Sequence, residues 1–143
     1  MTFGQLDQEL PNGFHDAEVH SITLDYFSGT VTLDVDFWVG DLDSPNREDH
    51  RRGMLTATGL LFCSIEPPDP SYPFLPDGAP ITVSGDSADS DTFPALAGLS
   101  HRFPAGSSCY RFFVNGWNSF IYIAATDVQI SWANYGERTE QSG

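Results

Sequence analysis

Apolar and polar residues alternate along most of this chain, whereas the spacing of amphipathic helices is rare. Such alternation is typical of β-strands that bury one face. The clearest example lies in residues 12–41, where two alternating runs flank a Ser28-Gly29 turn signal. A two-residue loop there sets Leu24 opposite Leu33, which predicts a hairpin that is apolar on one face and polar on the other.

Further strands are predicted downstream of this hairpin. Residues 54–65 are apolar on both sides in their second half, which favours a strand in the middle of the sheet. The proline-rich segment 66–80 is expected to be an irregular loop, because proline donates no ladder hydrogen bond. Residues 81–84 form a short predicted strand, residues 85–92 an acidic loop, and residues 93–99 one or two helical turns.

A second hairpin is predicted in the sequence "CYRFFVNGWNSFIYIAA". Its Asn-Gly pair suggests a two-residue turn, but that register mixes polar and apolar partners. A four-residue loop, 115–118, sets Phe112 opposite Ile121 on one face and Phe113 opposite Phe120 on the other. The four-residue loop is therefore the preferred interpretation.

The last strand signal changes phase, since Val128 and its alternate neighbours do not continue the pattern of Ile121. A bulge or break at residues 125–127 is the prediction. Together these elements predict a single all-β domain over residues 1–143 with six to seven strands and at most one short helix. The expected architecture is an antiparallel β-sandwich or a strongly curved sheet, with a partly open barrel as the alternative.

The charge balance narrows the class of partner. The chain holds 20 acidic and 6 basic residues, all six of them arginine, for a net charge of −14. Because nucleic acids and anionic lipids repel such a surface, neither nucleic acid nor a membrane is a predicted partner. A protein partner with a basic surface would suit it, and general solubility or adaptation to salt is the alternative explanation.

Compartment and redox state follow from simpler signals. No apolar run approaches the ~20 residues of a membrane helix, and the first ten residues lack the basic and apolar segments of a secretory signal. We therefore expect a cytoplasmic protein. Cys63 and Cys109 lie 46 positions apart without metal-binding spacing, so free buried thiols are predicted.

The adjacent pair His15-Asp16 invites a catalytic interpretation, but neighbours on a strand point to opposite faces. The alternate positions Asp16, Glu18 and His20 are the sharper candidate, because the hairpin register places them together on the continuation of the apolar face. Two carboxylates and an imidazole could hold a metal ion or perform acid–base chemistry. The alternative is a strand whose last inward positions simply reach water.

Other chemical signals are weaker. Asp34 and Asp36 resemble a DxD metal motif, although a solvated strand face explains them more simply. The sequence contains no nucleophile elbow, phosphate-binding glycine loop, zinc-protease motif or dinucleotide-binding motif. No cofactor is predicted, and an enzyme is the less favoured class.

An aromatic patch is predicted on the second hairpin. Its members are the four outward residues of the preferred register: Arg111, Phe113, Phe120 and Tyr122. A cross-strand contact of arginine with tyrosine would be of the cation–π kind. If this face is uncovered it is a candidate binding patch, since such residues dominate interface hot spots. If a second sheet covers it, it is ordinary core.

The opening "GFHDAEVHSITLDY" resembles the first hairpin of small bacterial β-proteins that begin with "FHDA". These proteins are mostly uncharacterised, and some are described as immunity proteins that neutralise the toxins of neighbouring cells. The resemblance covers roughly the first quarter of the chain and brings no catalytic residues. It implies that His15 and Asp16 belong to the opening turn of the fold.

Three hypotheses follow. The first is a non-enzymatic β-domain that binds a protein partner, with an immunity-type inhibitor as its specific form and a homodimer as an alternative assembly. The second is a metal-dependent or acid–base enzyme that uses Asp16, Glu18 and His20. The third is a binder of a small ligand held between sheets.

Overall fold

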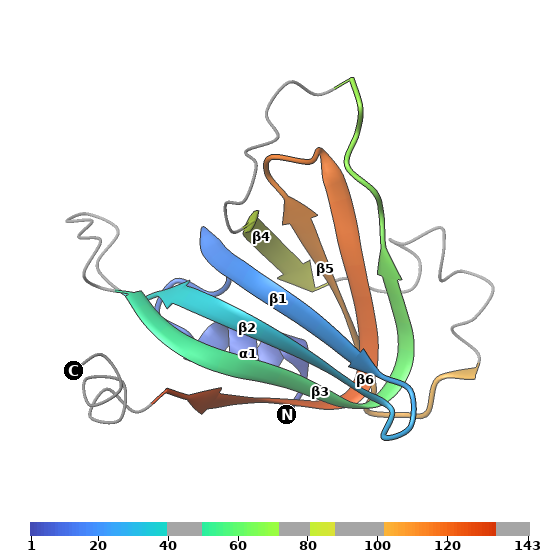
Figure 1. The fold of residues 1–143 in the computed structure, drawn as a ribbon. Coiled ribbons are helices and arrows are strands. Elements are labelled where there is room, and N and C mark those ends of the chain that lie inside the picture. Colours follow the sequence, from blue (N-terminus) through green and yellow to red (C-terminus); the bar gives the residue numbers. More distant parts are fainter. Residues whose placement is uncertain (40–49, 72–80, 88–101, 134–143) are drawn as a thin grey trace.

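The computed structural model describes residues 1–39, 50–71, 81–87 and 102–133, and within them it contains one helix and six strands (Figure 1). The elements in chain order are α1 (Phe3–Glu9), β1 (Ala17–Asp25), β2 (Thr30–Trp38), β3 (His50–Ile65), β4 (Ile81–Ser87), β5 (Ser108–Val114) and β6 (Ser119–Trp132). Each strand pairs antiparallel with its neighbours.

The six strands form one sheet in the order β1-β2-β3-β6-β5-β4, and pairing of β4 with β1 closes it into a barrel. The prediction of an antiparallel all-β fold with one short helix is confirmed. The sheet has the strong curvature that was expected, but it closes into a barrel and does not form a sandwich, so it is nearest to the partly open barrel given as the alternative. The closing pairs lie at Ala17–Val19 of β1 and Ile81–Val83 of β4, so this part of the two sheet edges cannot accept a strand from another chain.

Two irregularities bend the sheet. β1 contains one residue, His20, in excess of its partner strand, and β3 contains another between Leu60 and Phe62. Such bulges increase the local twist and bend the strand. Gly59 precedes the second bulge and has a φ of +60°. Figure 1 shows β3 and β6 bending together along their length, as a sheet must when it curls into a barrel.

The first hairpin forms, but with a different register from the predicted one. Asp25 pairs with Thr30, so the loop has four residues instead of two. Leu24 then lies opposite Val31 and Ile22 opposite Leu33, which corrects the predicted pairing of Leu24 with Leu33. A shift of two positions keeps the same faces together, so the apolar side of β2 is buried as predicted.

The second hairpin is confirmed in detail. Phe112 lies opposite Ile121 and Phe113 opposite Phe120, as the four-residue loop requires. Burial along β6 passes from odd to even positions between Ala125 and Val128, which confirms the predicted change of phase. The register shift associated with it is on the facing strand β3.

The predictions for the segments between β3 and β5 are confirmed only in part. Residues 66–70 contain no strand, in agreement with the predicted proline-rich loop, and residues 72–80 lie outside the described residues. Residues 85–87 of the predicted acidic loop belong to a strand, because β4 extends to Ser87. The rest of that loop and the predicted helical turns at 93–99 lie outside the described residues.

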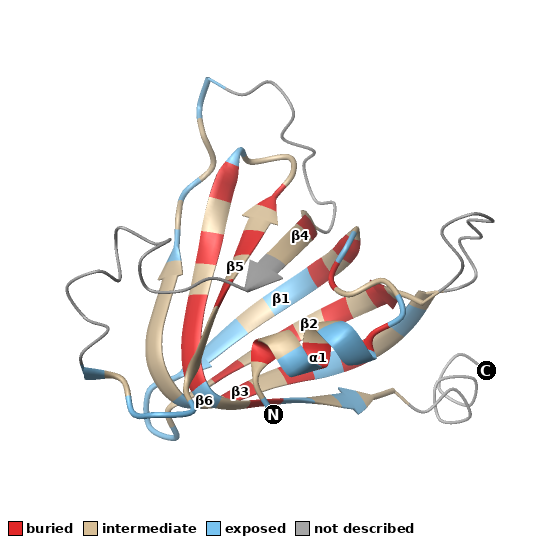
Figure 2. Cartoon of the chain, turned by 180° about the vertical axis from the view of Figure 1, so that it is seen from behind, coloured by how far each residue is buried: buried red, intermediate tan, exposed pale blue. Residues whose placement is uncertain are grey.

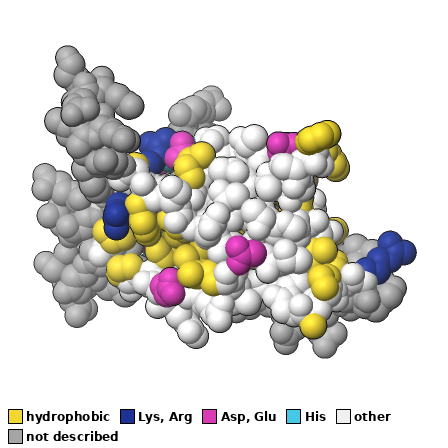
Figure 3. All heavy atoms as spheres, turned by 90° about the horizontal axis from the view of Figure 1, so that it is seen from below, with side chains coloured by type: hydrophobic (Ala, Val, Ile, Leu, Met, Phe, Trp, Pro, Cys, Tyr) yellow, Lys and Arg dark blue, Asp and Glu magenta, His cyan; other side chains and the backbone are white. Residues whose placement is uncertain are grey.

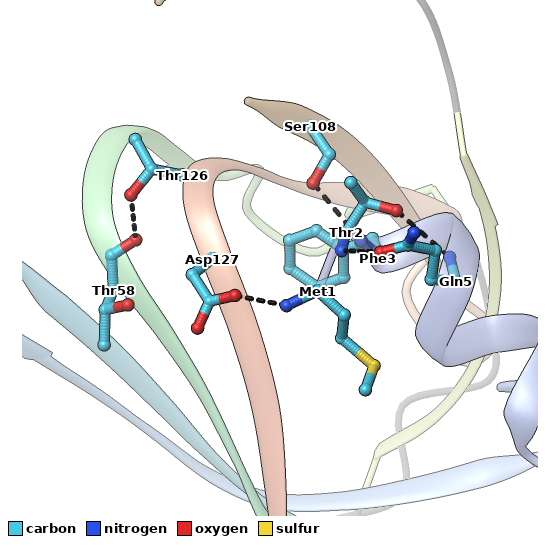
Figure 4. Close-up of polar contacts among 8 residues, drawn as sticks. All are labelled: Met1, Thr2, Phe3, Gln5, Thr58, Ser108, Thr126 and Asp127. Atoms are coloured by element: carbon cyan, nitrogen blue, oxygen red, sulfur yellow. Dashed lines mark hydrogen bonds and ion pairs between the residues drawn. The ribbon is translucent and has the colours of Figure 1, made fainter. Parts of the chain in front are cut away.

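The helix α1 was not predicted, although the sequence contains its signals. Thr2 caps the N-terminus, and the Thr2 and Gln5 side chains form a reciprocal capping box with the backbone (Figure 4). Phe3, Leu6 and Leu10 are buried at helical spacing. Among the described residues, no helix has the length and apolar character needed to cross a bilayer.

Polar contacts attach the start of α1 to the sheet. The N-terminal amine of Met1 forms an ion pair with Asp127 of β6, and the backbone N–H of Phe3 donates to Ser108 Oγ of β5 at 3.2 Å (Figure 4). In Figures 1 and 2, α1 lies against the inner side of the sheet, where it contacts β4, β5 and β6. One face of the helix therefore contributes Phe3 and Leu6 to the core of the barrel.

Five aromatic rings fill the space between α1 and the strands: Phe3, Phe14, Phe37, Tyr110 and Phe112, all essentially inaccessible to solvent. Phe14 is central, with ring centroids at 5.0 Å from Tyr110, 5.2 Å from Phe112 and 5.8 Å from Phe37. Such tilted and edge-on contacts add to the gain from burial alone. Figure 2 shows buried and less buried positions alternating along the strands.

The bend at Gly59 generates a stability prediction. In Gly59→Ala the new Cβ would lie 1.9 Å from Thr126 Oγ1, whose hydroxyl donates to the Thr58 carbonyl, and the residue would still need a positive φ. We expect a loss of about 2–4 kcal/mol in the free energy of unfolding, measured by urea denaturation. Gly29→Ala is the matched control, because Gly29 also has a positive φ (+66°) but open space around it.

Gly29→Ala should cost only about 1 kcal/mol, the price of the backbone conformation. Equal losses in the two variants would contradict the role of close packing between β3 and β6.

Candidate functional site

The pair His15-Asp16 lies in a turn before β1. Phe14 and Ala17 on either side are buried, whereas both polar side chains are about half exposed. Asp16 has a φ of +55°, and this irregular backbone lets its Oδ2 approach His15 Nε2 to 3.4 Å. The two side chains do not point apart as strand neighbours would, because the pair precedes β1 and its backbone is irregular. The His15 ring also stacks on Trp38, with centroids 6.0 Å apart.

The bulge at His20 changes which side of β1 faces the core. Val19 lies opposite Val35, but Ser21 lies opposite Asp34, so β1 gains one residue between them. Before the bulge the odd positions are buried, and after it the even position Ile22 packs against the core. His20 and its neighbours Glu18 and Ser21 consequently face outward.

This arrangement corrects the predicted trio. Asp16, Glu18 and His20 were expected on the continuation of the apolar face, but Glu18 and His20 lie on the outside of the barrel and Asp16 stays in the preceding turn. The group that converges instead is Glu18, His20 and Asp36, whose potential ligand atoms all lie within 4.8 Å of one another. Asp36 comes from β2, directly opposite Glu18.

Asp34 and Arg52 extend this group across β2 and β3. Arg52 donates from Nε to Asp34 Oδ1 at 2.6 Å and from its terminal nitrogen to Oδ2 at 2.7 Å, a bidentate ion pair. The Arg52 guanidinium holds the pKa of Asp34 below its ordinary value, and Asp34 raises the pKa of Arg52. We call Glu18, His20, Asp34, Asp36 and Arg52 the outer carboxylate face.

The electrostatics of the outer carboxylate face are unbalanced. Asp34 occupies both arms of Arg52, whereas within the described part of the chain no hydrogen bond is formed by the Glu18 or Asp36 carboxylate. Like charges placed directly opposite on neighbouring strands destabilise a sheet. Local rules are broken in this way most often at functional sites. The face therefore suits a positively charged group supplied from outside.

Other arginines are engaged elsewhere. Arg51 lies over the Trp132 ring at 4.4 Å, and Arg111 lies over the Phe120 ring at 4.9 Å. These are cation–π contacts, which stabilise modestly at partly exposed sites. Within the described residues, these two guanidinium groups therefore contact aromatic rings and not the outer carboxylate face.

The predicted aromatic patch forms on the outside of β5 and β6, and all four of its members are half-buried: Arg111, Phe113, Phe120 and Tyr122. The Phe120 ring joins it together, with centroids 5.2 Å from Phe113 and 5.8 Å from Tyr122. Arg111 makes a cation–π contact with the Phe120 ring, whereas the predicted contact was with tyrosine. Burial, with Glu66 nearby, raises the pKa of Tyr122, so its hydroxyl stays protonated at neutral pH.

Both cysteines are thiols outside any disulfide, as predicted, but they are half-buried instead of fully buried. Partial burial raises the pKa of the Cys63 thiol. A thiol with a raised pKa is a poor nucleophile at neutral pH. Cys63 is therefore a packing residue in this fold.

Comparisons with protein-family models, with curated proteins and with solved structures find no match to this chain. The resemblance to proteins with an "FHDA" opening is carried by the local sequence alone, and the structure assigns that motif to the turn in which Phe14 and Ala17 are buried.

The Asp34–Arg52 pair predicts a pH dependence. Because the folded state lowers the pKa of Asp34, the pair contributes stability above the ordinary value of 3.8, and this contribution is lost as the pH falls through the lower folded-state pKa. Asp34→Asn should lower the free energy of unfolding at neutral pH by about 1 kcal/mol or less, since the side chains of Asp34 and Arg52 are 24% and 35% exposed.

Urea denaturation at several pH values checks this prediction, and the difference between wild type and Asp34→Asn should shrink below pH 3.8. Asp36→Asn, on the same strand and face, is the control; because it removes a carboxylate that faces Glu18, it should raise the stability by about 0.2–1 kcal/mol. A constant difference at all pH values would disprove the pairing.

Proposed function

We propose that this protein is a non-enzymatic binding module whose outer carboxylate face docks on a basic protein partner. The observation that carries the proposal is the direct opposition of Glu18 and Asp36, with His20 beside them, while Asp34 engages the nearest arginine. A cationic side chain from a partner would relieve the repulsion between the two carboxylates. Removal of this repulsion would add to the free energy of binding.

The charge of the whole chain supports the same conclusion. A net charge of −14 attracts a basic partner over distances of about a Debye length, ~8 Å at physiological salt. Complementary fields of this kind raise association rates and exclude like-charged competitors. The outer carboxylate face would be the place where this general attraction becomes a defined contact.

The position of the carboxylates favours binding over catalysis. Catalytic and small-ligand sites are typically concave and shield the reacting groups from water. The outer carboxylate face lies on the outside of a closed barrel, and His20 is exposed. Inside the barrel, the aromatic cluster occupies the place that a small ligand would need.

A toxin that acts on nucleic acid is one partner of suitable chemistry, because proteins that contact phosphates present lysine and arginine. An immunity-type inhibitor that covers such a surface would be acidic, as this protein is. The "FHDA" opening agrees with this specific form of the proposal. A toxin-like reading frame beside the gene would supply the natural partner for the experiment.

A metal-dependent enzyme is the second candidate, favoured by the approach of Glu18, His20 and Asp36 to within 4.8 Å. Calorimetric titration with Zn²⁺ and Mn²⁺ separates the two. The binding proposal predicts no saturable heat. Saturable heat that disappears in His20→Ala would favour the metal site instead.

The partner proposal predicts a specific dependence on charge. Asp36→Asn should weaken binding to the product of a neighbouring toxin-like reading frame by about tenfold, mainly through slower association at low salt. Surface plasmon resonance at two salt concentrations measures both rates. Glu9→Gln on α1 is the matched control, because it removes one exposed charge outside the face.

Equal effects of Asp36→Asn and Glu9→Gln would mean that only total charge matters. Binding that does not respond to salt would contradict the electrostatic account altogether.

A further inference from the structure

The tip of the β1–β2 hairpin (residues 25–30, hereafter the hairpin tip) exposes two adjacent aromatic side chains. Tyr26 is 90% exposed and Phe27 is 102% exposed, which makes them the most accessible large hydrophobic residues among those described. Single exposed apolar residues are ordinary on protein surfaces, whereas two adjacent exposed rings present a larger apolar area to a partner. Figure 1 shows the hairpin tip at the lower edge of the barrel.

The loop that presents these rings is held by several hydrogen bonds. The Asp25 carboxylate accepts from the backbone N–H of Phe27 at 2.9 Å and of Ser28 at 3.3 Å. The Gly29 N–H donates to the Asp25 carbonyl at 3.0 Å, and the Gly29 carbonyl accepts from the Leu60 N–H at 3.0 Å. The hydrogen bonds to its carboxylate also hold the pKa of Asp25 below its ordinary value.

The hydrogen bonds that hold the backbone of the hairpin tip favour recognition by a partner. Tyrosine and phenylalanine have few rotatable bonds, so a fixed backbone leaves little conformational entropy to lose when they enter a partner's pocket. Residues of this kind dominate interface hot spots when they are fully desolvated on binding. The hairpin tip is therefore preorganised for insertion into an apolar pocket.

The hairpin tip and the outer carboxylate face belong to the same pair of strands. Seven positions of β1 separate Glu18 from Asp25, or roughly 20 Å at the rise of a strand. A standard interface buries about 800 Å² on each partner, which corresponds to a patch roughly 30 Å across. One partner of ordinary size can thus cover both features.

Charge decides what kind of partner fits. A second copy of this chain would bring another net charge of −14 to the interface, and an anionic lipid surface would be repelled in the same way. In the view from below in Figure 3, hydrophobic side chains gather on one area of the surface, and both acidic and basic side chains lie at its border. A basic protein surface with an apolar pocket matches the two exposed rings of the hairpin tip together with the carboxylates of the outer carboxylate face.

We infer that Tyr26 and Phe27 are the apolar anchor of the interface, and that they insert into a hydrophobic pocket rimmed by basic residues on the partner that binds the outer carboxylate face. This inference rests on the proposed function and adds the partner's chemistry to it. The carboxylates attract the partner, and the two rings slow its release.

The test uses the full chain and two synthetic peptides of equal length and positive charge. One is amphipathic, built from leucine and lysine, and the other replaces each leucine with serine. At low salt, wild type should bind the leucine–lysine peptide about tenfold more tightly than the serine–lysine peptide, measured by fluorescence anisotropy. The double variant Tyr26→Ser/Phe27→Ser should lose that preference and keep its affinity for the serine–lysine peptide.

The control variant is Ile65→Ser, which removes another exposed hydrophobic side chain, 50% accessible, at the C-terminal end of β3. It should bind both peptides as wild type does. The single variants Tyr26→Ser and Phe27→Ser, with circular dichroism to confirm folding, keep the test valid if the double variant unfolds.

The outcomes separate the two proposals. If wild type binds neither peptide, or if Asp36→Asn does not weaken binding of the serine–lysine peptide, the proposed function fails. If both peptides bind equally, or if Ile65→Ser loses the preference as fully as the double variant, the anchor is disproved while the proposed function stands. Binding to phosphatidylcholine vesicles that needs Tyr26 and Phe27 would assign the hairpin tip to lipid and overturn the inference.

Discussion

One extra residue in β1 determines how this protein presents its surface. At His20 the strand contains one residue more than the opposite segment of β2, so the buried positions change from odd to even. Without this bulge, His20 and Glu18 would lie on the same side as Ile22 and face the aromatic core. With it, they face outward beside Asp36, and the same distortion helps to curl the sheet until β4 reaches β1.

Packing in the interior fixes the positions of the residues on this outer surface. The rings of Phe14 and Tyr110 connect the opening turn to the strands, and Phe3 connects α1 to the same cluster. A barrel filled in this way has little freedom to repack. Unfavourable features can then persist on its outside, namely facing carboxylates and two solvated aromatic rings. Both are costs in the isolated protein that a partner would remove.

Much of the fold could be predicted from the sequence, and the failures have physical causes. The β5–β6 hairpin was predicted residue by residue, because only one loop length gives each face a consistent character. The β1–β2 loop was misjudged because Tyr26 and Phe27 look like strand residues although solvent surrounds them. The bulge at His20 is marked in the sequence by two consecutive polar residues, His20 and Ser21, between Val19 and Ile22. A strict alternation was assumed across them, so Asp36 was not joined to Glu18. The capping box of α1, by contrast, was present in the sequence and could have been found.

The bulge of β1 at His20 places Glu18 and His20 on the outside of the barrel beside Asp36 of β2. Cross-strand nuclear Overhauser effects in solution test this bulge directly, because they report which residues of β1 and β2 are opposite each other. The structure predicts contacts of Ile22 with Leu33 and of Val19 with Val35, on either side of an unpaired His20. Contacts of Ile22 with Val35 and of His20 with Phe37 would contradict it, since Glu18 and His20 would then face the core.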